Sequence, residues 1–137
     1  MRLIISKFLK YFLFLILNRK KFVKEINNEK ILFKIENSLT FDRALYYYEK
    51  DTLDWIDKFN EKDIFWDVGS CTGVYSVYAS LKKKCFVLAF EPFILNFNLT
   101  FENMKLNNVM DYCSVFNLFL GDTNHIYDIY IKKNVIG

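Results

Sequence analysis

Two acidic residues flank a short glycine-containing segment near the middle of the chain. Asp67 stands two residues before Gly69, and Glu91 follows Gly73 by 18 residues. Glycine lets a backbone turn sharply and lie close to a ligand, where a Cβ would intrude. Asp67 could accept a hydrogen bond from a ligand ammonium group, and Glu91 could accept from both hydroxyls of a ribose. The pattern therefore predicts a site shaped for a nucleoside.

Buried strands are needed to position these residues. Residues 64–68 form a near-continuous apolar run that contains Asp67, and residues 85–90 form a second run that ends beside Glu91. Such runs are typical of parallel strands covered on both faces. Between the two runs, apolar side chains recur at helical spacing. These side chains are Val74, Val77, Tyr78 and Leu81.

The same alternation continues toward the C-terminus. Pro92 suits the first turn of a second helix, which would end near residues 107–108. Its apolar stripe would contain Phe93, Phe97, Phe101 and Met104. A third strand is predicted at 112–120, a turn at 121–124 and a fourth strand at 125–131. Strands that alternate with helices predict an α/β fold with a parallel sheet, in which ligands bind at the carboxyl ends of the strands.

Two other glycine loops do not match this segment. A dinucleotide-binding fingerprint needs glycine at position 71 and at or near 74, where the chain has Cys71 and Val74. A phosphate-binding P-loop needs Gly-Lys-Ser/Thr, whereas Val74 and Tyr75 follow Gly73. An acid beside the glycines would also repel a phosphate. A cationic adenosyl ligand fits this charge better than a nucleotide does.

The segment and its flanks resemble the FkbM-type methyltransferases, which use S-adenosylmethionine and mostly act on hydroxyl oxygens. The resemblance covers about residues 30–131 and rests on an ordered set of motifs. These are Asp-Thr-Leu-Asp-Trp-Ile at 51–56, Phe-Trp-Asp-Val-Gly-Ser-Cys-Thr-Gly-Val-Tyr-Ser at 65–76, Ala-Phe-Glu-Pro at 89–92 with Asn96 and Phe97, Asn103 with Leu106 to Asn108, and Leu-Gly-Asp at 120–122.

The resemblance implies a Rossmann-like class I methyltransferase fold and S-adenosyl-L-methionine as the cofactor. The residues that it implies as cofactor ligands are Asp67, Gly69, Ser70, Gly73, Glu91 and Asn117. Asp67 would lie near the methionine end, Glu91 would hold the ribose hydroxyls, and Asn117 would lie close to the adenine. The family usually has Ala-Asn at positions 70–71, where this chain has Ser-Cys; both residues are small enough for the turn.

One part of the family pattern is absent. The next family strand typically carries Lys-Ile-Asp-Val-Glu-Gly near the methyl-transfer centre, and no such segment precedes Gly137. The family's sheet resembles the order 3-2-1-4-5-7-6, in which that strand lies beside the one that contains Asp67. We therefore expect a fold truncated after three or four strands, with residues 64–68 as an aggregation-prone apolar edge. We assign no catalytic residue.

The first 24 residues are basic and partly apolar. They carry a charge of +7, whereas the twelve basic and 16 acidic residues after them give −4. The longest uncharged stretch, residues 11–18, is shorter than the roughly 20 residues that a spanning helix needs. We expect a helix that lies at a membrane surface or packs on the protein's own sheet, with a signal anchor as an alternative. The acidic remainder disfavours a nucleic-acid partner.

Three regions follow from these patterns. Residues 1–24 would form a basic, apolar helix, 25–62 a lead-in strand and helix, and 63–137 a partial methyltransferase domain. Within the lead-in we expect a strand at 30–36, a turn at 37–38, and a helix capped by Asp51 that ends at residue 60.

Several residues also have a purely structural interpretation. Asp67 could cap the glycine turn, and Glu91 could favour the N-terminus of the following helix. His125, the single histidine, is more typical of a strand or turn than of a general base, and we expect no metal site. Three cysteines, an odd number, fit a reducing cytosol.

The favoured hypothesis is an S-adenosylmethionine-dependent methyltransferase that acts on a hydroxyl of a glycan or small metabolite. The alternative is a noncatalytic, membrane-associated fragment that binds a cofactor or a partner.

Overall fold

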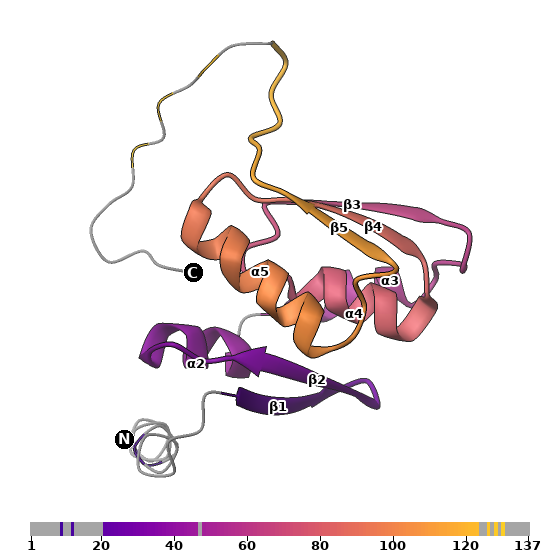
Figure 1. Ribbon diagram of the computed structural model, residues 1–137. Coiled ribbons are helices and arrows are strands. Elements are labelled where there is room, and N and C mark those ends of the chain that lie inside the picture. The colour runs from indigo at the N-terminus through magenta and orange to yellow at the C-terminus, as the bar shows by residue number, and fades with distance from the viewer. Residues whose placement is uncertain are drawn as a thin grey trace.

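The chain forms three layers, shown in Figure 1. The computed structural model describes residues 21–46 and 48–123 and the single positions 9, 12, 126, 128 and 130. A parallel sheet forms one outer layer, helices form the middle layer, and an antiparallel hairpin lies on the far side of the helices. The core therefore lies on one face of the parallel sheet, between that sheet and the hairpin.

The sheet is parallel, as the alternating pattern predicted, and its strand order is β3-β4-β5. Its strands are β3 (Ile64–Val68), β4 (Phe86–Phe90) and β5 (Cys113–Phe116). Helix α4 (Val74–Lys83) joins the first pair of strands, and α5 (Ile94–Leu106) joins the second. In the register of the parallel ladders, Asp67 lies beside Ala89 and Phe90 lies beside Phe116. The carboxyl ends of the three strands thus share one edge of the sheet.

A hairpin and two helices precede this unit. They are β1 (Lys21–Ile26), β2 (Glu29–Lys34), α2 (Ser38–Tyr46) and α3 (Lys50–Ile56). The two strands pair Ile26 with Glu29, so Asn27 and Asn28 form a two-residue turn. Both asparagines have positive φ, of 45° and 70°, as the usual hairpin turn of this length requires.

Helix α5 is attached to the hairpin through a side-chain amide. The Oδ1 of Asn107 accepts the Leu32 N–H at 2.9 Å, and its Nδ2 donates to the Leu32 carbonyl at 2.8 Å. The amide thereby replaces the partner that a further strand would give β2. Fully buried Val77 of α4 and Met104 of α5 fill the space between the layers.

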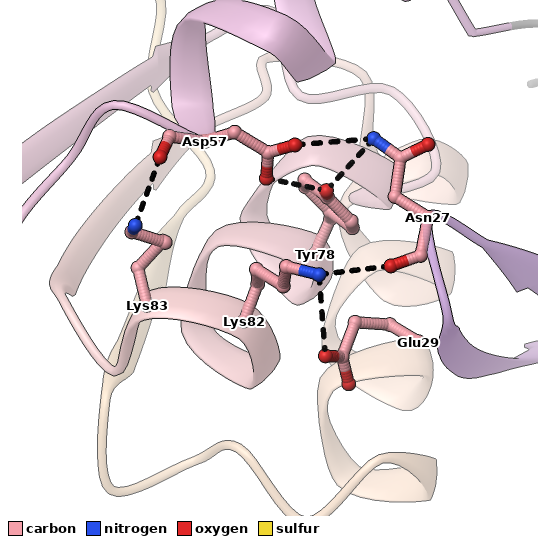
Figure 2. A network of polar contacts seen from close by, with 6 residues as sticks. All are labelled: Asn27, Glu29, Asp57, Tyr78, Lys82 and Lys83. Atoms are coloured by element: carbon pink, nitrogen blue, oxygen red, sulfur yellow. Dashed lines mark hydrogen bonds and ion pairs between the residues drawn. The ribbon is translucent and has the colours of Figure 1, made fainter.

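A polar network joins the hairpin to α4 and to the residue that follows α3 (Figure 2). Its members are Asn27, Glu29, Asp57, Tyr78, Lys82 and Lys83. The Tyr78 hydroxyl donates to Asp57 at 2.6 Å and accepts from Asn27 at 3.1 Å. Burial, together with the hydrogen bond to Asp57, raises the pKa of Tyr78 to about 12. Lys82 adds a bond of 2.8 Å to the Asn27 carbonyl.

The lead-in differs from the sequence-based expectation at two places. Residues 21–24, which we placed with the N-terminal helix, belong to strand β1; most of that predicted helix lies outside the described residues. The turn expected at 37–38 is instead the start of α2. Asn37 caps this helix, because its Oδ1 accepts the Thr40 N–H at 3.0 Å while Thr40 Oγ1 accepts the Asn37 N–H at 3.0 Å.

Two predicted helix boundaries were also wrong. Helix α3 begins at Lys50 after Glu49, so Asp51 lies in its first turn and is not its cap; the helix ends at Ile56. Pro92 precedes the cap residue of α5, Phe93, and is not in the first turn. The buried face of α5 contains Leu99, Thr100, Asn103 and Met104, whereas Phe97 and Phe101 are only half-buried.

The sheet itself corrects three details. The expectation that β3 is covered on both faces was wrong, since Ile64, Trp66 and Val68 are 58% to 64% exposed. Strand β5 ends at Phe116 and not at 120, because β4 ends at its partner Phe90. In the predicted fourth strand, the described positions 126, 128 and 130 are not in a strand.

No helix in the described part of the chain is long and apolar enough to cross a membrane.

Candidate functional site

The two acids and the glycine segment lie together at the carboxyl edge of the sheet. Asp67 is the penultimate residue of β3, and Glu91 directly follows β4. Residues 69–73 connect β3 to α4. The N–H groups of Gly69 and Ser70 donate to the Phe90 carbonyl at 2.8 and 3.1 Å. The fold therefore brings together the acids and glycines that the sequence singled out.

The two glycines of the loop are required for different reasons. Both have positive φ, 78° at Gly69 and 72° at Gly73. A Cβ added at Gly73 would lie 2.8 Å from the Thr100 Cγ2, so this glycine permits close packing against α5. A Cβ added at Gly69 would meet no atom within 4 Å. The backbone at Gly69 is therefore open to a ligand.

Glu91 is buried and holds the loop in place. One carboxylate oxygen accepts the Cys71 N–H at 2.9 Å, and the other accepts the Phe93 N–H at 2.9 Å. The side chain is thus engaged at the start of α5, as the structural interpretation expected. Each carboxylate oxygen can accept a second hydrogen bond. Glu91 can therefore keep its structural contacts and still receive donors from a ligand.

Asp67 is the second buried acid, with 7% of its surface exposed. Burial raises the pKa of its carboxyl, hydrogen bonds from the hydroxyl and backbone of Ser76 lower it, and the charge of Glu91 raises it further. The Ser76 hydroxyl donates to Asp67 at 2.5 Å. The side chain of Asp67 is therefore bonded to helix α4, which follows the glycine turn. A cation beside this carboxylate would offset part of the cost of its burial.

Helix α5 fixes the other side of the loop. Thr100 Oγ1 donates to the Cys71 carbonyl at 2.9 Å, and Asn103 Nδ2 donates to the Thr72 carbonyl at 2.8 Å. The Ser70 hydroxyl is buried at 3.5 Å from Thr100 Oγ1. The side chain of Ser70 thus packs toward α5, which gives this residue a structural part in the loop.

Asn117 lies at the same edge of the sheet, directly after β5. Its Nδ2 donates to the carbonyls of Glu91 and Pro92 at 2.8 and 2.9 Å. The residue is exposed and joins the end of β5 to the end of β4. Asn117 therefore lies next to Glu91, and its contact with an adenine stays a prediction.

The residues present fit an adenosyl cofactor. A buried carboxylate suits an ammonium group, the backbone at Gly69 is open, and the side-chain oxygen of Asn96 is buried with no hydrogen-bond partner within the described chain. Asn96 stands in the first turn of α5, five residues after Glu91. His125 lies outside the described residues. The described part of the chain contains no group of three or more side chains that could hold a metal ion.

Sequence reasoning missed Arg43, which donates from its Nη1 to the Sγ of Cys71 in the loop. Arg43 belongs to α2, a helix that we did not predict. The Asn37–Thr40 spacing could have indicated the start of this helix, but no local pattern indicates that the helix reaches the glycine loop. Cys71 itself has a positive φ of 55°, a conformation that favours glycine.

No protein-family model and no curated protein matches the chain. Among solved structures, TYW2 of P. horikoshii in complex with MeSAdo has a TM-score of 0.54 and 20% identity, over 73% of this chain and 36% of that one. TYW2 of M. jannaschii in complex with AdoMet has a TM-score of 0.51 and 18% identity, over 76% of this chain and 44% of that one. Trm5b of Pyrococcus abyssi has a TM-score of 0.52 and 21% identity, over 80% of this chain and 31% of that one.

The chain has a Rossmann-like class I methyltransferase fold. Its strand order β3-β4-β5 corresponds to one side of the sheet of this fold, as the resemblance implied. The chain spans 31% to 44% of the length of the three solved structures above. The candidate site is the carboxyl edge of the parallel sheet, where the glycine loop, Asp67 and Glu91 meet.

Proposed function

We propose that this chain is the cofactor-binding part of an S-adenosylmethionine-dependent methyltransferase. The observation that carries the proposal is the loop of residues 69–73, held between the buried carboxylates of Asp67 and Glu91 at the ends of neighbouring parallel strands. Ligands of α/β sheets bind at this edge. The complexes of the two TYW2 structures, with MeSAdo and AdoMet, support an adenosyl ligand in a chain of this fold.

The proposed ligand contacts follow from the chemistry of each side chain. Asp67 would accept from the ammonium group of the cofactor, whose positive charge would stabilise an otherwise costly buried carboxylate. Glu91 would accept from the ribose hydroxyls through its second lone pairs. Asn117 would lie near the adenine, and the backbone of Gly69 would allow the ligand to approach closely.

When bound, S-adenosylmethionine supplies a methyl group whose bond to sulfur breaks as a bond to the acceptor oxygen forms, while a base takes the hydroxyl proton. The described residues contribute positioning. Because Glu91, Thr100 and Asn103 hold the loop through side-chain bonds, the methyl group would be presented in a fixed place. Holding two reactants in an attack geometry is a large part of catalysis for such a displacement.

We further propose that the enzyme is of FkbM type and that its acceptor is a hydroxyl of a glycan or small metabolite, not a nucleic acid. The motif that contains Asn103 and residues 106–108 supports this assignment. Asn103 and Asn107 of this motif attach α5 to the glycine loop and to β2. These two residues of the family pattern therefore hold α5 against the glycine loop and the hairpin in this chain.

Isothermal titration calorimetry of the 137-residue chain with S-adenosylmethionine and S-adenosylhomocysteine tests the proposal. We expect both ligands to bind, and Glu91→Gln to weaken both by about tenfold, because one charge-assisted contact is lost. The exposed Glu61 provides a matched control, since Glu61→Gln should leave binding unchanged. A cooperatively folded sample that binds neither ligand would contradict the proposal.

A second proposal concerns the basic N-terminal residues and an anionic membrane surface. Seven basic residues precede the first acid. One of them, Lys24, is used within the fold, because it donates to the Leu45 carbonyl and lies 4.2 Å from the ring centre of Tyr48. Flotation of the chain with anionic vesicles should depend on residues 1–20 and weaken with added salt. Equal flotation after deletion of residues 1–20 would exclude this contact.

A further inference from the structure

Arg43 brings a positive charge to the cofactor loop from outside the parallel sheet. It lies in the last turn of α2, and its guanidinium donates to the thiol of Cys71, midway between Gly69 and Gly73. Arg43 and Cys71 are both half-buried. Burial raises the pKa of the Cys71 thiol, and the positive charge of Arg43 opposes that rise. The electrostatic influence of Arg43 therefore reaches the loop.

A thiol is a poor match for this guanidinium. Arginine presents five N–H donors in a planar fork that matches the two oxygens of a carboxylate, whereas a thiol sulfur is a weak acceptor. Hydrogen bonds from a guanidinium to a carboxylate are about twice as strong as those between neutral groups. A carboxylate at this position would therefore bind Arg43 more strongly than the Cys71 sulfur does.

The charges around the loop require such a cation if the ligand is an amino acid derivative. The amino-acid end of S-adenosylmethionine carries an ammonium group and a carboxylate on one carbon. Asp67 can bind the ammonium group, but both Asp67 and Glu91 would repel the carboxylate. A carboxylate taken from water into this site needs a positive partner. Within the described chain, Arg43 is the basic side chain that hydrogen-bonds to the loop.

We infer that Arg43 binds the carboxylate of the cofactor's amino-acid end. The inference rests on the proposed function and adds α2 to the cofactor site. The lead-in is then a functional part of the site as well as a support for α4 and α5. Arg43 would give the site a preference for adenosyl ligands that keep the amino-acid group over those that lack it.

Two probes that differ only at this end of the ligand test the inference. S-adenosylhomocysteine carries the amino-acid group, and methylthioadenosine lacks it. We expect Arg43→Gln to weaken S-adenosylhomocysteine by roughly 10- to 100-fold in calorimetry, the range for a lost charge-assisted contact. Methylthioadenosine should bind this variant within about twofold of wild type. Arg43→Lys should be intermediate, because it keeps the charge but loses the fork.

A lysine of the same lead-in region provides the matched control. Lys34 pairs with Glu36 at 3.0 Å, and Lys34→Gln removes one positive charge without touching the loop. Both probes should bind this variant as they bind wild type. Retained methylthioadenosine binding by Arg43→Gln also reports that the site of this variant is folded.

The outcomes separate the inference from the proposal on which it rests. An Arg43→Gln variant that binds S-adenosylhomocysteine like wild type, or that loses both probes equally, overturns the role of Arg43 and leaves cofactor binding standing. A wild-type chain that binds neither probe overturns the proposed function, and the role of Arg43 with it.

Discussion

The carboxylate of Glu91 accepts the backbone N–H of Cys71 at 2.9 Å, and this bond ties the end of β4 to the loop that follows β3. Its other oxygen accepts the N–H of Phe93 at 2.9 Å, at the start of α5. One buried side chain thereby connects a strand, a loop and a helix. The loop is shaped by the protein itself, which is the condition for presenting a ligand in a fixed geometry.

Glu91→Gln should destabilise the folded chain. Glutamine places an NH₂ group where one of the two backbone N–H groups now finds an oxygen, so one buried hydrogen bond is lost. We expect the free energy of unfolding to fall by roughly 1–3 kcal/mol, measured by urea denaturation. Glu61→Gln, at an exposed position, should change it by less than about 0.5 kcal/mol. Equal stability of the two variants would show that Glu91 does not hold the loop.

Asp67→Asn should stabilise the chain while it weakens cofactor binding. Because burial raises the pKa of Asp67 in the folded state, its contribution to stability falls as the pH rises from below 3.8 through the raised pKa. Asparagine keeps an oxygen for the Ser76 hydroxyl but carries no charge. We expect a gain of roughly 0.5–2 kcal/mol at pH 7, which should disappear in acid.

Thermal unfolding across this pH range measures the stability change of Asp67→Asn, and calorimetry with S-adenosylhomocysteine measures the loss of affinity. A variant that is less stable than wild type at pH 7 would contradict the expected destabilising effect of the buried Asp67 charge, and unchanged affinity for S-adenosylhomocysteine would contradict its part in binding.

Asn103→Ala should weaken the attachment of α5 to the loop and to the hairpin. Asn103 Oδ1 accepts the Lys34 N–H at 2.7 Å, and its Nδ2 donates to the Thr72 carbonyl at 2.8 Å. Removal leaves two backbone groups unsatisfied, with an expected cost of roughly 2–4 kcal/mol. Amide hydrogen exchange at Lys34 should accelerate more than the global loss of stability explains. The exposed Asn98 of the same helix is the control, and Asn98→Ala should be neutral or slightly stabilising.

The stability of the chain should decrease as the pH rises from about 10 to about 12. The pKa of Tyr78 is raised to about 12 from 10.0, so the folded state holds the hydroxyl proton more tightly than the unfolded state does. The contribution of Tyr78 is therefore complete below pH 10.0 and is lost as the pH approaches 12. Tyr78→Phe should lower the free energy of unfolding by roughly 1.5–3 kcal/mol at pH 8.

Denaturant unfolding between pH 8 and 12 measures this effect. The slope of stability against pH should be shallower in Tyr78→Phe than in wild type, because the other groups that titrate in this range are common to both. Parallel slopes would assign the alkaline loss of stability to groups other than Tyr78.

The exposed face of β3 should promote self-association of the chain. Ile64 and Val68 are 64% and 60% exposed on a strand whose only partner in the described sheet is β4. Ile64→Lys and Val68→Lys should reduce the concentration-dependent mass measured by light scattering. Val23, which is 53% exposed on β1, provides the control, since Val23→Lys should have little effect. Wild-type chain that stays monomeric at high concentration would contradict this expectation.

The parallel unit was predictable because its signals are local. Each strand is indicated by its own apolar run, at 64–68 and at 85–90. The helix between them is indicated by the apolar spacing that starts at Val74, and the site by the two acids. Exposure of Trp66 was not predictable in this way, because an apolar run does not report how many faces of a sheet are covered. The run at 112–120 continues past the point where β4 supplies partners, so the sequence overestimated β5.

The lead-in and its contact with the site depend on tertiary structure. Helix α2 begins through reciprocal bonds between Asn37 and Thr40, and that pattern is also compatible with a simple turn. Arg43 and Cys71 are 28 residues apart, and their contact exists only because α2 packs against the glycine loop. The sequence could therefore identify the acids and glycines of the candidate site but not the contact of Arg43 with the loop.

Amide chemical shifts of the ¹⁵N-labelled 137-residue chain, recorded during titration with S-adenosylhomocysteine, test the central claim most directly. Cofactor binding at the proposed site predicts saturable shifts at Gly69, Cys71 and Phe93, and none at the hairpin turn of Asn27 and Asn28. A spectrum of folded chain that does not change, or changes confined to the hairpin, would contradict the assignment of this loop as the S-adenosylmethionine site.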